Sequence, residues 1–96
     1  MLLIKYTQAE KVIMREIAGE FILVPIKGRL ADLQRIYMLE GIGSFLWTTL
    51  NKPITEEEIV LRVVEEFDVD KHTAMLDVRD FLAKMKKEGL IVENMA

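Results

Sequence analysis

The fold of this chain is decided by residues 55–92, which read TEEEIVLRVVEEFDVDKHTAMLDVRDFLAKMKKEGLIV. Thr55 and Glu58 form the pattern of a capping box, in which the hydroxyl accepts from a free N–H group of the first turn and the Glu side chain reaches back to the N–H group of the cap. A helix is therefore predicted to begin here. Its apolar residues recur at helical spacing and predict one buried stripe, made of Ile59, Val60, Val63, Val64 and Phe67.

A second amphipathic helix follows, with its own start and stop signals. Asp70 is the expected N-cap, and Gly89 can adopt the left-handed conformation that ends many helices. Lysines in the last turn complement the negative end of the helix dipole: Lys84, Lys86 and Lys87. The expected buried stripe is Met75, Val78, Phe81, Leu82 and Met85. Residues 90–92 then read as a returning strand.

Length and composition predict a small soluble domain. With 96 residues the chain can form a single hydrophobic core. Its longest uncharged stretch, residues 41–51, is far shorter than the roughly 20 apolar residues of a membrane span, and no secretory signal is recognised. The absence of cysteine excludes disulfides, thiolate metal sites and thiol nucleophiles, so we expect a cytoplasmic protein. The net charge of -3 argues against a general nucleic-acid binder.

The first 40 residues are predicted to be mostly β-structure. Residues 1–11 have mixed character and predict a mobile or partly docked arm. Two β-prone runs follow, at residues 12–17 and 20–26. Ala18 and Gly19 separate them, a connection that suits a tight hairpin because Gly accepts positive φ.

The next segment completes the expected sheet and leads into a helix. Pro25 lacks a backbone N–H group and therefore predicts that the second strand ends at a sheet edge or a bulge. Residues 33–39 are predicted to form a third strand, neither face of which is fully polar. Residues 44–50 predict a short buried helix, in which Trp47 is expected to pack in the core.

Short motifs recur in order along residues 15–93: REI at 15–17 before Gly19-Glu20, LVP at 23–25, LEGIG at 39–43 running into FLW at 45–47, TEEEI at 55–59, EFDV at 66–69, DV at 77–78 with FL at 81–82, and GLI at 89–91. In their order and spacing these motifs resemble the PqqD family. That family comprises small proteins of pyrroloquinoline quinone synthesis and is related to the precursor-peptide recognition domains of ribosomally made, modified peptides. At the position after Leu39 the family often has Asn, whereas this chain has Glu40. The difference affects a cap or turn contact at residue 40 and not the fold.

The resemblance implies an α+β fold, with a three-stranded antiparallel sheet followed by three helices in a winged-helix-like arrangement. Residues 12–96 would form this single domain. It also implies a non-catalytic protein that binds the leader segment of a precursor peptide and presents it to a radical S-adenosylmethionine enzyme. The leader would add as a further strand along the third strand, in a groove walled by the third helix. An edge strand offers unpaired backbone groups for such β-augmentation, while side-chain pockets provide specificity.

The helix that begins at Asp70 is the third of the three expected helices, and it has two flanks beside its buried stripe. One flank is charged and expected to be solvated: Asp77, Lys84 and Glu88. The other combines small or apolar residues with cations that would pair with an acidic leader: His72, Leu76, Arg79, Ala83 and Lys86. We predict that this second flank lines the groove; alternatively, Leu76 only widens the core stripe and the cations are ordinary surface charges. The expected peptide contacts are Leu33, Arg35, Ile36, Tyr37, Met38, Leu39, Leu76, Arg79, Ala83 and Lys86.

Other chemistry finds little support, so no catalytic residue, metal site or cofactor is predicted. His72 is the only histidine, which excludes a multi-histidine metal site. The acidic run at residues 56–58 lies where a helix N-terminus favours negative charge. The alternative function is a winged-helix DNA-binding or transcription-complex adaptor domain, but residues 71–88 mix cations with acids. The expected partners are thus a leader peptide and its modifying enzyme, not nucleic acid or membrane, with the chain a monomer or weak homodimer.

Overall fold

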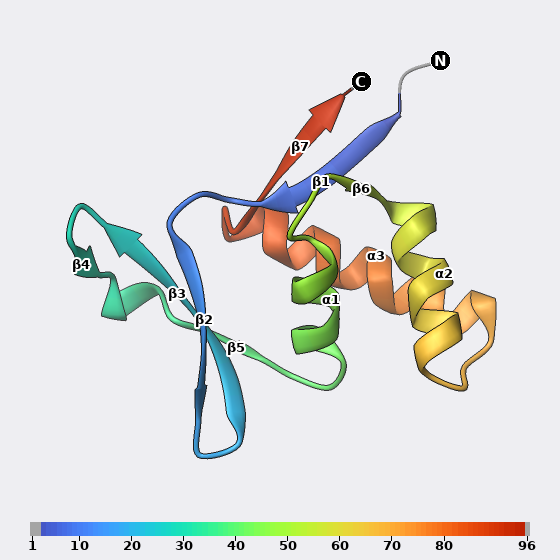
Figure 1. The fold of residues 1–96 in the computed structure, drawn as a ribbon, viewed down its shortest axis with the longest axis horizontal. Coiled ribbons are helices and arrows are strands. Elements are labelled where there is room, and N and C mark those ends of the chain that lie inside the picture. Colours follow the sequence, from blue (N-terminus) through green and yellow to red (C-terminus); the bar gives the residue numbers. More distant parts are fainter. Residues whose placement is uncertain (1–2, 96) are drawn as a thin grey trace.

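The first sheet is built around the hairpin predicted at Ala18 and Gly19. Both residues have positive φ, 54° and 82°, as a two-residue type I′ turn requires. Strands β2 (Val12–Ile17) and β3 (Glu20–Lys27) pair antiparallel on either side of this turn. Figure 1 shows the hairpin in a computed structural model that describes residues 3–95, apart from the side chain of Leu33. The predicted hairpin is therefore confirmed.

The predicted third strand over residues 33–39 is only partly correct. β4 (Leu30–Ala31) and β5 (Tyr37–Leu39) both pair with β3, but Leu33–Arg35 forms a 3-10 turn, η1, between them. Asp32 causes this turn because its side chain accepts a hydrogen bond of 3.2 Å from the Gln34 N–H. The first half of the expected strand is therefore diverted out of the sheet.

The end of β3 around Pro25 lies neither at a sheet edge nor at a bulge, because β2 and β4 pair with it on its two sides in regular register, so this prediction is wrong. β3 runs between β2 and the pair β4 and β5, and it continues to Lys27. The Pro25 carbonyl accepts a 2.7 Å hydrogen bond from the Asp32 N–H. On this side of β3, the pairing with β5 ends at Leu23 and the pairing with β4 begins at Ile26. Pro25, which has no backbone N–H group, therefore lies in the gap between the two pairings.

A second sheet, absent from the sequence analysis, contains the expected N-terminal arm. β1 (Ile4–Gln8) lies between β6 (Ile54–Thr55) and the returning strand β7 (Ile91–Met95). The Gln8 side chain also donates a 2.8 Å hydrogen bond to the Trp47 carbonyl. The arm is thus docked over Ile4–Gln8, because both edges of β1 are paired.

The part of the chain that the structure describes contains three α-helices: α1 (Gly43–Thr49), α2 (Glu56–Glu66) and α3 (Lys71–Lys87). The caps are those predicted. Thr55 and Glu58 form both bonds of a capping box, and Asp70 accepts a 2.8 Å hydrogen bond from the Thr73 N–H. Gly89 ends α3 with a φ of 71°. The predicted α+β class, with antiparallel strands and three helices, is confirmed.

The core lies where the three helices meet the inner faces of both sheets. Trp47 is 3 % exposed and Leu50 is fully buried. α3 directs Ala74, Val78, Leu82 and Met85 into this core, whereas Met75 and Phe81 of the predicted stripe are only partly buried. Phe81 therefore keeps one side accessible beside β5. Within residues 3–95, no helix has the length and apolar character needed to cross a membrane.

Candidate functional site

The direction of the backbone groups in β3 decides which groups of β5 are free. In an antiparallel strand, the N–H and C=O of one residue point to the same neighbour, and successive residues alternate. The Pro25 carbonyl bonds to the Asp32 N–H on the β4 and β5 side, while the Ile26 N–H bonds to the Lys11 carbonyl, at 2.7 Å, on the β2 side. Odd-numbered residues of β3 therefore face β5.

β5 consequently exposes the backbone of its middle residue. Its register with β3 pairs Phe21 with Leu39 and Leu23 with Tyr37. These odd-numbered partners exchange the hydrogen bonds, so the N–H and C=O of Met38 face away from β3. Among residues 3–95, no strand pairs with that side of β5. The structure thus contains the free strand edge that strand addition requires.

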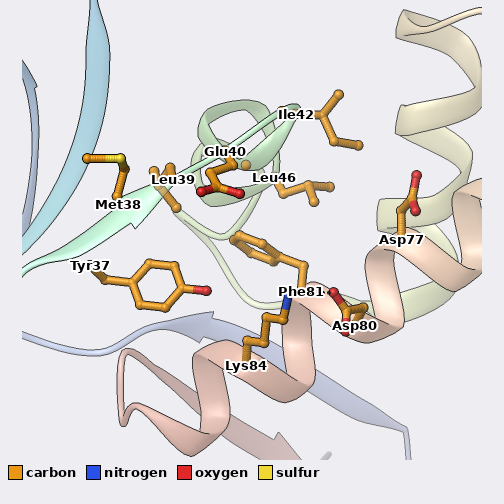
Figure 2. A pocket seen from close by; sticks show the side chains of 12 residues that line it. Tyr37, Met38, Leu39, Glu40, Ile42, Leu46, Asp77, Asp80, Phe81 and Lys84 are labelled. Atoms are coloured by element: carbon orange, nitrogen blue, oxygen red, sulfur yellow. Dashed lines mark ion pairs between the residues drawn. The ribbon is translucent and has the colours of Figure 1, made fainter.

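A hollow of about 780 Å³ lies between this free edge and α3 (Figure 2). Its walls come from β5, the turn into α1, α1 itself and α3. The Tyr37 ring points from β5 toward Phe81 and Lys84 on α3. The residues that line it are Tyr37, Met38, Leu39, Glu40, Gly41, Ile42, Gly43, Leu46, Asp77, Asp80, Phe81 and Lys84.

Two glycines bring α1 close to the end of β5. Gly41 turns the chain with a φ of 55°, a conformation that L side chains rarely adopt. A Cβ atom on Gly43 would lie 3.3 Å from the Leu39 Cβ and 3.8 Å from Phe81 Cε1. Gly43 therefore lets α1, β5 and α3 approach one another, which forms the closed end of the hollow. The chain thus makes a tight turn from strand to helix at these glycines.

The charges around the hollow are mostly negative. Lys84 Nζ lies 3.0 Å from Asp80 Oδ2, and both side chains are more than half exposed. The hydrogen bond to Asp80 is the main cause that raises the pKa of Lys84, and the charges of Asp80, Tyr37 and Glu40 act in the same direction. Glu40 and Asp77 form no ion pair with any residue in the described range 3–95.

The helix flank predicted to line the groove faces elsewhere. Arg79 Nε donates to Glu56 Oε2 on α2 at 3.0 Å, and Lys86 forms an ion pair with Glu93 on β7. Leu76, which is 52 % exposed, and Ala83, also exposed, do not line the hollow. The predicted orientation of α3 is therefore corrected: the flank that borders the hollow beside β5 is the other one, which carries Asp77 and Lys84. Peptide contact by the predicted flank stays a prediction.

The predicted residues before and within β5 are divided by the structure. Tyr37, Met38 and Leu39 line the hollow. Ile36, which precedes Tyr37 in the sequence, is 43 % exposed. Arg35 does not line the hollow; its guanidinium donates a 2.7 Å hydrogen bond to the Glu88 carbonyl at the end of α3. The side chain of Leu33 lies outside the described part of the chain.

Among the lining residues not predicted from the sequence are Glu40 and Ile42 after β5, Leu46 on α1, and Asp80 and Phe81 on α3. A signal for the first pair was available, because the LEGIG motif continues directly from the strand. Phe81 was assigned wholly to the core stripe. Among residues 3–95, no group of three His, Cys, Asp or Glu side chains is placed to hold a metal ion.

Comparison with known proteins identifies relatives of this arrangement. The family described as Coenzyme PQQ synthesis protein D (PqqD) matches residues 11–91. The solved structure of TbiB1 in complex with the TbiA(beta) leader peptide is similar to this chain, with a TM-score of 0.69 and 27% sequence identity. That similarity covers 88% of this chain and 93% of TbiB1. No curated protein matches the sequence.

Proposed function

Because the chain belongs to the PqqD family, we propose that it is a non-catalytic protein that captures the leader segment of a ribosomally made precursor peptide. The leader adds as a strand along the free edge of β5 and rests against α3. The chain then presents the precursor to a modifying enzyme of the radical S-adenosylmethionine type, in pyrroloquinoline quinone synthesis or a related pathway of modified peptides. Such a protein works in the cytoplasm, where precursors are made.

The observation that carries this proposal is the free edge at Met38, which borders a hollow lined by both apolar and charged side chains. Main-chain hydrogen bonds to Met38 give affinity that depends little on peptide sequence, and the hollow gives selectivity through the side chains that enter it. The TbiB1 structure holds a leader peptide, which supports the same class of ligand here. The peptide contacts we propose are Tyr37, Met38, Leu39, Ile42 and Phe81, with Glu40, Asp77, Asp80 and Lys84 at the margins.

The flank chosen from the sequence is a competing location. Ala83 lies outside the hollow and is exposed, so Ala83→Glu tests that flank without entering the hollow. The corresponding probe of the hollow is Ile42→Asn, which replaces an apolar lining side chain by a polar amide without adding charge. If the leader binds in the hollow, Ile42→Asn weakens binding and Ala83→Glu leaves it unchanged. The reverse result moves the leader to the flank of Leu76, Arg79 and Ala83.

The direct test is a titration of the isotope-labelled chain with leader peptides from short reading frames beside its gene. Amide shifts are expected in β5 and in the α3 residues that face it, while α2 stays nearly unchanged. Retained amide dispersion in each variant shows that folding survives. Shifts confined to α2, or no binding by any neighbouring leader peptide, would contradict the proposed function.

The presenting role predicts a particular dependence on concentration. A binding module raises the local concentration of its peptide beside the enzyme, so it matters most when the peptide is scarce. Removing the chain should therefore lower modification strongly at low precursor concentration and weakly at saturation. A defect that persists at saturating precursor would indicate a structural role in the enzyme complex instead.

A further inference from the structure

We infer that the hollow beside β5 selects leaders that carry a Lys or Arg residue two positions from an apolar residue. This inference rests on the proposed function and adds to it the chemical class of the ligand. It reverses the expectation from the sequence, in which cations of α3 were to pair with an acidic leader.

The charge of the hollow carries the first step. Its described lining holds the carboxylates of Glu40, Asp77 and Asp80 and the ammonium group of Lys84. Three negative groups and one positive group leave a formal charge of -2. Lys84 is already engaged by Asp80 at 3.0 Å. An acidic leader would therefore meet net repulsion here, whereas a cation would meet two carboxylates that lack an ion pair among residues 3–95.

The contrast with the opposite flank of α3 strengthens this step. There the cations are already satisfied, because Arg79 pairs with Glu56 and Lys86 pairs with Glu93. An acidic leader on that flank would have to compete with both internal carboxylates. Of these two flanks of α3, the one at the hollow therefore carries a carboxylate, Asp77, that has no ion pair among residues 3–95.

The position of the cation follows from strand geometry. Side chains on one face of a strand recur every second residue. Tyr37 and Leu39 lie on the face of β5 that borders the hollow, so alternate residues of an added strand point the same way. One of them meets Phe81, which lies between Tyr37 and Asp77 in Figure 2. The next residue on that face, toward the end of β5, approaches Glu40 and Asp77.

Selection of short random peptides displayed on phage tests this inference with no leader sequence chosen in advance. The full chain is the bait. Peptides that bind at the β5 edge are those recovered from the parent chain but not from the Met38→Pro variant. We expect enrichment of an apolar residue followed or preceded, two positions away, by Lys or Arg. Replacing that cation by Gln in a synthetic binder should lower affinity about threefold to tenfold, because exposed charge pairs are individually weak.

A double-mutant cycle identifies the carboxylates involved. Asp77→Asn and Glu40→Gln should weaken the cationic peptide and have little effect on its Gln variant. Glu57→Gln is the matched control, because Glu57 is exposed on α2 and lies outside the hollow. This substitution removes the same single negative charge. The coupling should also decrease as salt rises.

The two ways of failing are distinguishable. Binders that prefer acidic residues, or a cycle with no coupling at Glu40 and Asp77, overturn the charge inference and leave the proposed function intact. A library without any binder that depends on the β5 edge contradicts the proposed function, and the inference then fails with it.

Discussion

Arg35 donates a 2.7 Å hydrogen bond to the Glu88 carbonyl oxygen and so connects the segment before β5 to the end of α3. At the other end of the hollow, Gly43 allows Leu39 and Phe81 to approach α1. The two walls of the hollow are therefore fixed relative to each other at both ends. Arg35 thus supports the proposed site as a positioning residue, although sequence analysis expected it to touch the peptide.

Arg35→Ala should weaken leader binding severalfold while costing no more than about 1 kcal/mol of stability, because the lost hydrogen bond is exposed. Without it, the start of β5 can move away from α3. Peptide titration and urea unfolding measure the two effects. Arg62→Ala is the matched control, since Arg62 is exposed on α2. Equal affinity of the Arg35 and Arg62 variants would exclude a positioning role.

Met38→Pro should abolish strand addition and leave the sheet formed. The Met38 N–H faces away from β3, and proline is tolerated in edge strands where its missing N–H faces solvent. The partner variant, Met38→Ala, keeps the N–H group and removes only a half-exposed side chain, so its affinity should stay within a few-fold of the parent. Both are read by peptide titration, after circular dichroism shows a folded chain. Binding by Met38→Pro at parental affinity would contradict β-augmentation at β5.

Most helix boundaries could be predicted from the sequence because they depend on local chemistry. The Thr55 and Glu58 capping box, the Asp70 cap and the Gly89 stop involve residues within one turn of each other. The second sheet depends instead on β1 meeting β6 and β7, which lie far along the chain. The sequence of the first 11 residues contains no local pattern that indicates these partner strands. It therefore predicted only an arm.

The candidate site was half predictable for the same reason. The edge strand was recognised, since the family resemblance located it, but its length was overestimated because the Asp32 turn was not seen. The flank of α3 was chosen by residue character alone. Its true orientation depends on where β5 and α2 pack, and this places Asp77 at the hollow and Arg79 beside Glu56.

Gly43→Ala should disturb β5 more than its stability cost suggests. The new Cβ would lie 3.3 Å from the Leu39 Cβ, so Leu39 must move by a few tenths of an ångström. We expect a loss of about 1 kcal/mol and shifted amides at Tyr37 and Leu39. Gly41→Ala is the comparison: its φ of 55° makes the substitution strained, but a Cβ there meets no atom within 4 Å. Amide shifts in β5 that are as large for Gly41→Ala would contradict the packing role of Gly43.

The last prediction concerns acid sensitivity of the capping box. The hydrogen bond from the Thr55 hydroxyl, followed by that from the Thr55 N–H, lowers the pKa of Glu58 from its ordinary value of 4.5. A carboxyl whose pKa is lowered in the folded chain binds protons more readily when unfolded. Its stabilising contribution is therefore present above pH 4.5 and decreases as the pH falls through the folded-state pKa.

Glu58→Gln should accordingly flatten the loss of stability below this pH, because the amide does not titrate. The measurement is urea unfolding of parent and variant at a series of pH values from neutral to acidic. Glu57→Gln, one residue away in the same turn, removes a carboxylate outside the capping box and serves as control. Asp70 still titrates in both variants. Hydrogen bonds from Thr73 lower the pKa of Asp70 from 3.8, so the capping contribution of Asp70 also decreases in acid. Parallel pH profiles for parent and Glu58→Gln would show that this box does not contribute to acid sensitivity.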